Sequence, residues 1–250
     1  MARARLAQVA CCLALCSATN ELPTRALSLA DRFVTCLFDP STGTFDSYEA
    51  LWQSGNTLET LARLSIALNT TVWASVFSAA FAQTPVIVDN CFDDHQWWGL
   101  AWVAAYEAFR APPYLQRAAA VFEDTASKAW RPTPCDGGVL WCPTGNPYFN
   151  AITVELFLSS AMALHPYAAS LGKPASYYLD WANKTWAWLA GSGMINAQSL
   201  VNDGLTSQCT NNGQTTWTYN MHSFGAVREY KSLHPRALGT PTRTPWAAML

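Results

Sequence analysis

CFDDHQWWGLAWVAAY, residues 91–106, is the stretch that decides the fold. From Trp97 to Tyr106 it carries no charged residue, and glycine and alanine recur along it. A helix that is apolar nearly all round is surrounded by other helices, and its small residues let those neighbours approach closely. The stretch therefore predicts an inner helix of an all-α protein.

Helical periodicity predominates along the rest of the chain, and strand-like alternation is rare. The predicted helices cover residues 24–38, 47–68, 72–82, 94–110, 114–130, 149–165, 175–190 and 214–231. The helix at 114–130 carries Arg117, Glu123 and Lys128, so one of its sides should face water. Inner apolar helices that alternate with outer amphipathic helices predict a toroid of helical hairpins.

The overall composition describes a well-buried globular protein. Of the 250 residues, 50% are hydrophobic and 13% are charged, and the formal net charge is −2. No clustered basic face is evident, which argues against a nucleic-acid partner. The compact apolar segment Val72–Ala82 is too short to span a bilayer, so we expect no membrane span.

The N-terminus resembles a secretory signal peptide. Arg3 and Arg5 precede an apolar run, and small residues follow it, so we assign residues 1–18 to a signal peptide. The alternative is a buried N-terminal helix. Two sequons, which begin at Asn69 and Asn183, also fit a secreted protein.

Five cysteines remain after the predicted signal peptide, so at most two disulfides can form and one thiol is left over. Cys135 and Cys142 flank Asp-Gly-Gly, which is a turn signal. A local disulfide between these two cysteines is therefore plausible.

The adjacent pair Asp93 and Asp94 is the candidate catalytic centre. At a helix entrance both carboxyls can lean toward one cavity, whereas in a strand they would point to opposite faces. Retaining glycosidases need a nucleophile and an acid/base about 5–5.5 Å apart, a spacing that neighbours reach easily. Mutual repulsion and the tryptophans downstream would keep one carboxyl protonated, which separates the two roles.

The same tetrapeptide has a purely structural interpretation. Asp93-Asp94-His95-Gln96 has the pattern of a helix N-cap with glutamine three residues later, and acidic residues suit a first helical turn. A metal site is disfavoured, because these ligands are too close in sequence to surround one ion and no second cluster supports them.

Five motifs in order extend the pattern beyond the aspartate pair. They are LWQSGNTLETLARL at 51–64, CFDDHQWWGL at 91–100, CDGGVLWCPTGNPYFNAITVELFL at 135–158, GSGMINAQSLVNDGL at 191–205 and NNGQTTWTYN at 211–220. In this order and spacing they closely resemble glycoside hydrolase family 76, the endo-α-1,6-mannanases. The resemblance covers roughly residues 45–220.

The resemblance implies an (α/α)6 barrel and retaining hydrolysis of α-1,6-linked mannan without metal or organic cofactor. Asp93 matches the family's nucleophile and Asp94 its acid/base. Further positions match the family's motifs as substrate-binding candidates: Asn56, Trp97, Trp141, Asn202, Asp203, Tyr219 and Asn220.

Several of these residues also have structural interpretations. Trp98 should pack in the core, while Trp141 follows a glycine turn in a predicted loop and suits sugar stacking. Asn202-Asp203-Gly204 is an ordinary turn sequence, and Tyr219 could be a core residue. His95, often acidic in the family motif, could tune the aspartates or be solvated, and we expect the second.

The C-terminal sequence departs from the family pattern. After Asn220, arginine, proline and threonine replace the apolar periodicity, and fewer helices are predicted than a complete (α/α)6 barrel contains. We therefore expect a partial catalytic domain over 19–231, incomplete at the C-terminus, and an irregular tail over 232–250.

The functional prediction is a secreted or cell-wall, monomeric endo-α-1,6-mannosidase whose partner is α-1,6-mannan or another mannose-containing cell-wall glycan. Two alternatives share the same sequence features. One is a transglycosylase that remodels cell-wall glycan, and the other is a catalytically inactive glycan-binding or cell-wall protein.

Overall fold

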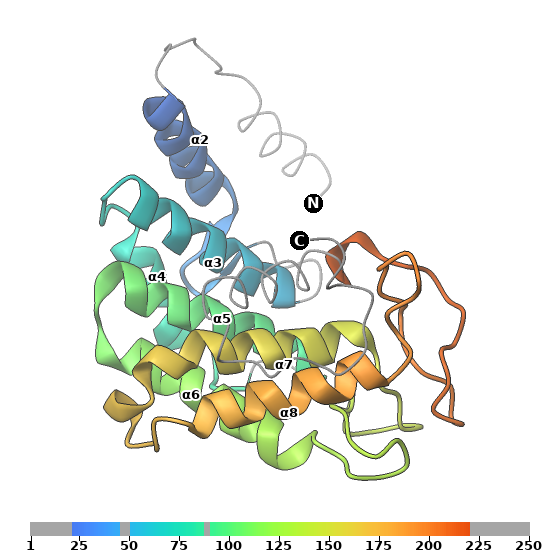
Figure 1. Ribbon diagram of the computed structural model, residues 1–250. Helices are drawn as coiled ribbons and strands as arrows, with labels where there is room; N and C mark the ends of the chain where they lie inside the picture. Colours follow the sequence, from blue (N-terminus) through green and yellow to red (C-terminus); the bar gives the residue numbers. More distant parts are fainter. Residues whose placement is uncertain (1–21, 46–50, 88–90, 221–250) are drawn as a thin grey trace.

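The computed structural model describes residues 22–45, 51–87 and 91–220, and this part of the chain is mainly helical (Figure 1). The helices are α2 (Leu22–Leu37), α3 (Leu51–Ala67), α4 (Ala74–Gln83), α5 (Phe92–Phe109), α6 (Pro112–Lys128), α7 (Ala151–Leu164) and α8 (Tyr177–Gly191). Two short 3-10 turns, η1 (His165–Tyr167) and η2 (Ala169–Leu171), follow α7. Strands β1 (Phe38–Asp39) and β2 (Thr44–Phe45) form a small antiparallel hairpin.

The all-α prediction is confirmed, and the predicted helix ends agree with the observed ends to within a few residues. The predicted helix at 214–231 begins at residue 218, and the described residues end at 220. The predicted signal peptide at 1–18, the boundary at 231 and the tail at 232–250 lie outside the described residues.

Helices α3 and α5 run parallel and in contact. Near their N-terminal ends, the Trp98 indole N–H donates to the carbonyl of Leu51 at 3.0 Å. Toward their C-terminal ends, Arg63 forms an ion pair with Glu107 at 2.8 Å. Because both contacts advance in the same direction along the two helices, the helices are parallel neighbours.

Helix α7 continues this parallel layer on the other side of α5. The Gln96 amide donates to the carbonyl of Thr153 at 3.2 Å, and Leu100 shares a small apolar cluster with Leu156. Helices α3, α5 and α7 thus form an inner layer, as the sequence of α5 predicts. Eleven residues of α5 and twelve of the 14 residues of α7 are buried.

The outer helices run antiparallel to the inner ones. Across the α5–α6 pair, Trp102 stacks on Tyr114 with ring centroids 5.5 Å apart, whereas His95 contacts Thr125 at 3.2 Å. Helices α5 and α6 therefore make an antiparallel hairpin. This arrangement is the one expected of an (α/α) barrel segment.

Two glycines explain how closely α5 packs against its neighbours. A Cβ at Gly55 of α3 would lie 3.1 Å from the backbone nitrogen of Trp98, and one at Gly99 would lie 3.1 Å from the side chain of Val121. Larger residues would push α3 or α6 away from α5. The small residues of the inner helix thus allow the close approach that the sequence predicts.

The apolar segment that was weighed as a membrane span forms α4, a helix of ten residues. Its buried side chains Phe77 and Ala80 belong to the core. Within 22–45, 51–87 and 91–220, none of the helices has the length and hydropathy needed to cross a bilayer.

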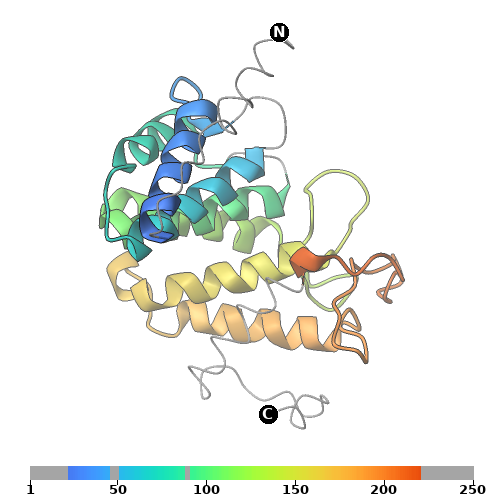
Figure 2. The same ribbon diagram turned by 90° about the horizontal axis from the view of Figure 1, so that it is seen from above.

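Two loop regions gather at one end of the helices, as both views of the molecule show (Figures 1 and 2). They are residues 131–150, between α6 and α7, and residues 192–217, after α8. The N-terminal ends of α5 and α7 meet these loops, because Phe92 N–H donates to the Trp141 carbonyl and Ala151 N–H donates to that of Asp203. Parallel inner helices thus place several positive dipole ends at one rim.

Two disulfides link this rim, and they correct one prediction. Cys91 pairs with Cys142 and Cys135 pairs with Cys209, so the expected local Cys135–Cys142 disulfide is wrong. Cys36 is buried in α2 and belongs to neither disulfide.

The predicted turn does form between the two cysteines, but its geometry separates them. Asp136, Gly137 and Gly138 all have positive φ, and the chain after them pairs Val139 with Trp130. That pairing carries the following residues back along the end of α6 and away from the turn. Cys142 therefore reaches the N-terminus of α5, while Cys135 is left to face the loop after α8.

Candidate active site

Asp93 and Asp94 lie in the first turn of α5, and both are partly buried. The N-cap position is Cys91, which makes no side-chain capping bond. Gln96 donates to the Phe92 and Thr153 carbonyls, not to the N-cap, so the predicted capping box is absent. The pair sits at the positive end of the helix dipole, which favours negative charge there.

Asp93 accepts two N–H groups. The Trp141 indole donates to its Oδ2 at 2.9 Å, and the Asp94 backbone N–H donates to its Oδ1 at 3.0 Å. The first contact spans 48 residues of sequence and holds the loop at 131–150 over the aspartate pair. Trp141 remains 41% exposed, so most of its ring is available to a ligand.

The backbone fixes Trp141 in this position. Its carbonyl accepts the Phe92 N–H at 2.7 Å, and its own N–H donates to the Tyr148 carbonyl at 2.9 Å. The neighbouring Cys142 is tied to Cys91 by a disulfide. Covalent and hydrogen bonds therefore hold the indole against the start of α5.

A third carboxylate, Asp203, lies among the loops at the same rim. Its Oδ2 accepts a short hydrogen bond from the Tyr148 hydroxyl, and its Oδ1 accepts the Trp217 indole N–H at 3.1 Å. Asn212 also donates to the Tyr148 hydroxyl, at 2.8 Å. Burial, and then the hydrogen bond to Asp203, raises the pKa of Tyr148, so it stays a neutral donor.

Tyr219 lies next to Trp217, the residue whose indole donates to Asp203. It is 42% exposed, so the alternative of a core residue is wrong. Its ring stacks on Trp217, with centroids 5.8 Å apart and planes inclined by 9°. Burial of its hydroxyl raises the pKa of Tyr219, and the nearby charges of Asp203 and Asp93 raise it further.

The two predicted asparagines of this region are buried. Asn202 is 5% exposed, and its amide donates to the Gly204 carbonyl and to the Asn212 side chain. The Asn202 side chain therefore holds the loop that carries Asp203. The predicted turn at 202–204 contributes to the site by positioning Asp203. Asn220 is 1% exposed and lies in the helical turn that begins at residue 218.

Trp97 lies one turn after Asp93 on α5 and is partly buried. It packs on the apolar cluster of Leu100, Ile152 and Leu156 on the inner helices. Its neighbour Trp98 is fully buried, which confirms the prediction that Trp98 belongs to the core. Trp97 therefore lies on the same face of α5 as Asp93.

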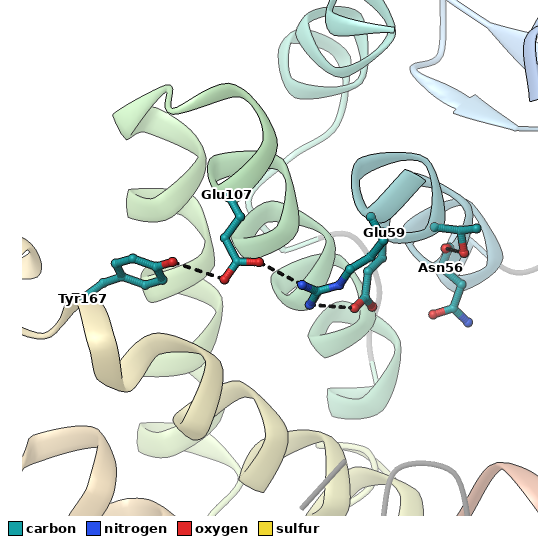
Figure 3. Close-up of polar contacts among 6 residues, drawn as sticks. Asn56, Glu59, Glu107 and Tyr167 are labelled. Carbon is teal, nitrogen blue, oxygen red and sulfur yellow. Dashed lines mark hydrogen bonds and ion pairs between the residues drawn. The ribbon is translucent and has the colours of Figure 1, made fainter. Parts of the chain in front are cut away.

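Asn56 is not brought to the aspartate pair by any contact among the described residues. It lines a groove of about 420 Å³ between α2 and α3, together with apolar side chains such as Phe33 and Leu61. Figure 3 shows Asn56 beside a chain of polar contacts in which Tyr167 and Arg63 bond to Glu107, and Asn56 takes no part in it.

His95 corrects another prediction. It was expected to be solvated, but it is 1% exposed and contacts the Thr125 hydroxyl of α6 at 3.2 Å. Its position on α5 turns it toward the outer helix, where Phe92 packs against the imidazole at 5.2 Å. Helix α6 covers α5 on this side, so the His95 side chain is buried.

Sequence reasoning missed three polar partners of the site and one buried acid, namely Tyr148, Asn212, Trp217 and Glu155. All four lie inside the motifs at 135–158 and 211–220, so the motifs were the available signal. The pairing of these residues depends on loops that meet only in the folded chain.

Glu155 is unusual among these residues. It lies on α7 with 0% exposure, and neither of its carboxyl oxygens has a hydrogen-bond partner among the described residues. Burial raises the pKa of Glu155 well above its ordinary value, because the apolar surroundings disfavour the charged form. Glu155 lies near the start of α7, the end of the helix at which Ala151 N–H donates to the Asp203 carbonyl.

The geometry therefore combines two helix-mouth aspartates, a third carboxylate and three exposed aromatic rings, from Trp141, Trp217 and Tyr219. Carboxylates accept hydroxyl hydrogen bonds, and flat exposed rings offer apolar faces for stacking. No group of three or more histidine, cysteine, aspartate and glutamate side chains suited to a metal ion occurs in the described ranges.

Two curated relatives of this chain carry the same name. "Mannan endo-1,6-alpha-mannosidase DCW1" of Eremothecium gossypii is 32% identical over 144 residues, which are 51% of this chain and 31% of that protein. The protein of the same name from Saccharomyces cerevisiae is 31% identical over 142 residues, covering 51% of this chain and 30% of that protein. The chain thus spans about a third of the length of these curated relatives.

Solved structures share the fold. An inactive variant of the alpha-1,6-mannanase GH76A of Salegentibacter sp. HEL1_6, in complex with alpha-1,6-mannotetrose, superposes with a TM-score of 0.71 at 18% identity. The match covers 86% of this chain and 66% of that chain. Dfg5 from Chaetomium thermophilum, in complex with glucosamine, also gives a TM-score of 0.71, at 20% identity, covering 88% of this chain and 62% of that one.

The family model described as glycosyl hydrolase family 76 matches residues 38–224, which is about three quarters of the chain and includes every residue of the site. The resemblance inferred from the five motifs is confirmed by this match. The chain belongs to glycosyl hydrolase family 76.

Proposed function

We propose that the chain is a retaining endo-α-1,6-mannosidase in which Asp93 is the nucleophile and Asp94 the acid/base. The observation that carries the proposal is the pair's position in the first turn of α5, with the Trp141 indole donating to Asp93. Two N–H donors and the helix dipole stabilise a negative charge on Asp93, as a nucleophile requires.

The reaction has two balanced steps. In the first, an Asp93 carboxylate oxygen attacks the anomeric carbon of a mannose unit while Asp94 gives its proton to the leaving glycosidic oxygen. In the second, Asp94 takes a proton from water, and the resulting hydroxide displaces Asp93 from the sugar. Two inversions leave the anomeric configuration unchanged.

The relatives support this substrate and these residues. The curated relatives are named mannan endo-1,6-alpha-mannosidases. In the mannanase variant described as inactive, two consecutive aspartates are replaced by alanine. Two disulfides at the rim of the site fit an oxidising compartment, so we further propose that the protein is secreted or belongs to the cell wall. A monomeric state remains a prediction.

The experiment is hydrolysis of α-1,6-mannan by the wild type, Asp93→Asn and Asp94→Asn. Both variants should lose nearly all activity, and NMR of the initial wild-type product should show retained configuration. Asp180→Asn is the matched control, because Asp180 is an exposed acid in the first turn of α8. Activity that survives in both active-site variants would reject the assignment.

Two alternatives use the same residues. In a transglycosylase, a sugar hydroxyl would replace water in the second step, and the glucosamine bound to Dfg5 gives a precedent for a second kind of sugar in this fold. A transfer product formed with an added mannoside acceptor would favour it. A glycan-binding protein without turnover would bind mannan and release no new reducing ends.

A further inference from the structure

Gln96 is a buried polar side chain between α5 and α7, the two inner helices that meet the rim. It is 0% exposed. Its amide nitrogen donates to the carbonyl of Phe92 at 2.8 Å and to the carbonyl of Thr153 on α7 at 3.2 Å. The oxygen of the same amide is buried and has no hydrogen-bond partner within the described part of the chain. The two N–H groups therefore fix the orientation of the amide.

Stability gives no reason for an amide at this position. Phe92 and Thr153 both belong to helices, where each carbonyl accepts the backbone N–H four residues later. Their carbonyls therefore have donors without Gln96. The buried amide oxygen, in contrast, gave up its hydrogen bonds to water on folding and gained none, which is a cost. An apolar side chain of similar length would avoid this cost, so the amide contributes little to the free energy of unfolding.

The first hydrogen bond of Gln96 acts on the backbone that leads into the aspartate pair. Phe92 directly precedes Asp93 in the first turn of α5. Its N–H donates to the Trp141 carbonyl at 2.7 Å, and its carbonyl accepts the Gln96 amide. The peptide groups on both sides of Phe92 are therefore held immediately before Asp93 and Asp94.

The second hydrogen bond of Gln96 acts on the start of α7. The Thr153 hydroxyl donates to Asn150 Oδ1 at 2.5 Å, and Ala151 N–H donates to the Asp203 carbonyl at 2.8 Å. This end of α7 is thus fastened to the loop that carries Asp203. A single buried side chain therefore joins the turn that bears the aspartate pair to the helix end that holds Asp203.

Apolar packing alone would leave the two helices free to shift slightly along their axes. Leu100 of α5 packs with Ile152 and Leu156 of α7. Such contacts are non-directional, whereas a hydrogen bond is restricted in both distance and angle. The contact of Gln96 with Thr153 is thus suited to fix the axial register of α5 against α7.

We propose that Gln96 is a positioning residue, which sets this register and thereby holds Asp93 and Asp94 at the height that the reaction needs relative to Asp203. The inference rests on the proposed function. Because Gln96 is fully buried, it acts through the backbone of Phe92 and not by contact with the sugar. Misplacement of reacting groups by about 1 Å can lower a rate about 100-fold, so a smaller shift of the aspartate pair should lower kcat about tenfold.

The test compares wild type, Gln96→Met and Thr185→Val in the hydrolysis of α-1,6-mannan. Methionine fills a similar space and donates no hydrogen bond. In Gln96→Met, we expect kcat of the folded protein to fall about tenfold and KM to change less than about threefold. The melting temperature should not fall, because the amide contributes little to stability.

Thr185→Val is the matched control. Thr185 is also 0% exposed, and its hydroxyl donates to the Trp181 carbonyl within α8. The variant loses a buried side-chain hydrogen bond that joins no second helix, so its kcat should equal that of wild type.

Three results would contradict the inference. A kcat of Gln96→Met within twofold of the wild-type value would overturn it and leave the proposed function intact. An equal fall of kcat in Thr185→Val would show that the loss of any buried hydrogen bond has this effect, and would overturn it as well. If the wild type itself releases no new reducing ends from α-1,6-mannan, the proposed function and the role of Gln96 are rejected together.

Discussion

The indole N–H of Trp141 donates to Asp93 Oδ2 at 2.9 Å, although 48 residues separate them in the chain. The contact joins the loop at 131–150 to the first turn of α5. It places an aromatic face beside the proposed nucleophile and a donor on its carboxylate. In the proposed mechanism, Trp141 therefore has two roles, which are stacking on the substrate and stabilising the charge of Asp93.

Replacing Trp141 by phenylalanine should separate these two roles. Trp141→Phe keeps an aromatic ring and removes the donor to Asp93. A hydrogen bond to a charged group contributes about 1.5–3 kcal/mol, so kcat on α-1,6-mannan should fall at least tenfold. Trp217→Phe is the comparison, because it removes a donor from Asp203 and should mainly raise KM. Equal kcat for wild type and Trp141→Phe would show that the donor has no catalytic role.

The two disulfides should differ in their effect on activity. Each closes a long loop, of 51 residues for Cys91–Cys142 and 74 for Cys135–Cys209. Replacing either pair by serine should therefore lower the free energy of unfolding by about 2–4 kcal/mol in denaturant titrations.

Only the Cys91→Ser/Cys142→Ser variant should also lower kcat of the folded fraction, because Cys142 adjoins Trp141. Cys135→Ser/Cys209→Ser serves as the matched control. If the two variants lose the same share of kcat after correction for folded protein, the Cys91–Cys142 disulfide has no special role in placing Trp141.

Glu155→Gln should change the pH dependence of stability. Burial raises the pKa of Glu155 in the folded state above the ordinary value of 4.5. Above pH 4.5 the unfolded chain therefore releases this proton while the folded chain retains it. The folded state binds more protons, so the stability contributed by Glu155 falls as the pH rises.

Urea titrations of wild type and Glu155→Gln at pH 4 and pH 7 test this sign. The free energy of unfolding of Glu155→Gln, relative to that of wild type, should be higher at pH 7 than at pH 4, because glutamine does not ionise. Glu59→Gln makes the same substitution in the partly exposed ion pair with Arg63 and serves as the control. A pH slope shared by wild type and Glu155→Gln would contradict the prediction.

The two sequons should differ in glycosylation when the protein is secreted by a eukaryotic host. Asn69 is exposed just after α3, and Thr71 is exposed as well. Asn183 lies within α8, its side-chain oxygen is buried, and Thr185 is fully buried with its hydroxyl bonded to the Trp181 carbonyl. A glycan at Asn183 would have to displace this packing.

Mass spectrometry of glycopeptides should therefore find a glycan on Asn69 and none on Asn183 in the folded, secreted protein. Asn69→Gln should remove the mass shift of the glycan, whereas Asn183→Gln should leave it unchanged. A folded product that carries a glycan on Asn183 would contradict the assignment.

Sequence reasoning succeeded where the information is local. The uncharged stretch from Trp97 to Tyr106 predicted an inner helix, and the burial of Trp98 confirms it. The aspartate pair was placed at a helix entrance because adjacent carboxyls can share a face only there. The family motifs also located Asp203 and Tyr219, which the structure brings to the same rim.

Reasoning from the sequence failed where the outcome depends on which loops meet. Cys135 and Cys142 flank a turn, yet the pairing of Val139 with Trp130 sends them to different partners. His95 has no local feature that marks it as buried, and only the packing of α6 against α5 excludes water from it.

The sequence by itself thus determined the helices, their inner or outer character and the location of the aspartate pair, because periodicity and adjacency act over a few residues. The tertiary structure alone decided that Trp141 contacts Asp93, that Trp217 contacts Asp203, and that Glu155 is fully buried. These features arise when parallel inner helices bring distant loops to one rim, and no spacing along the chain encodes that meeting.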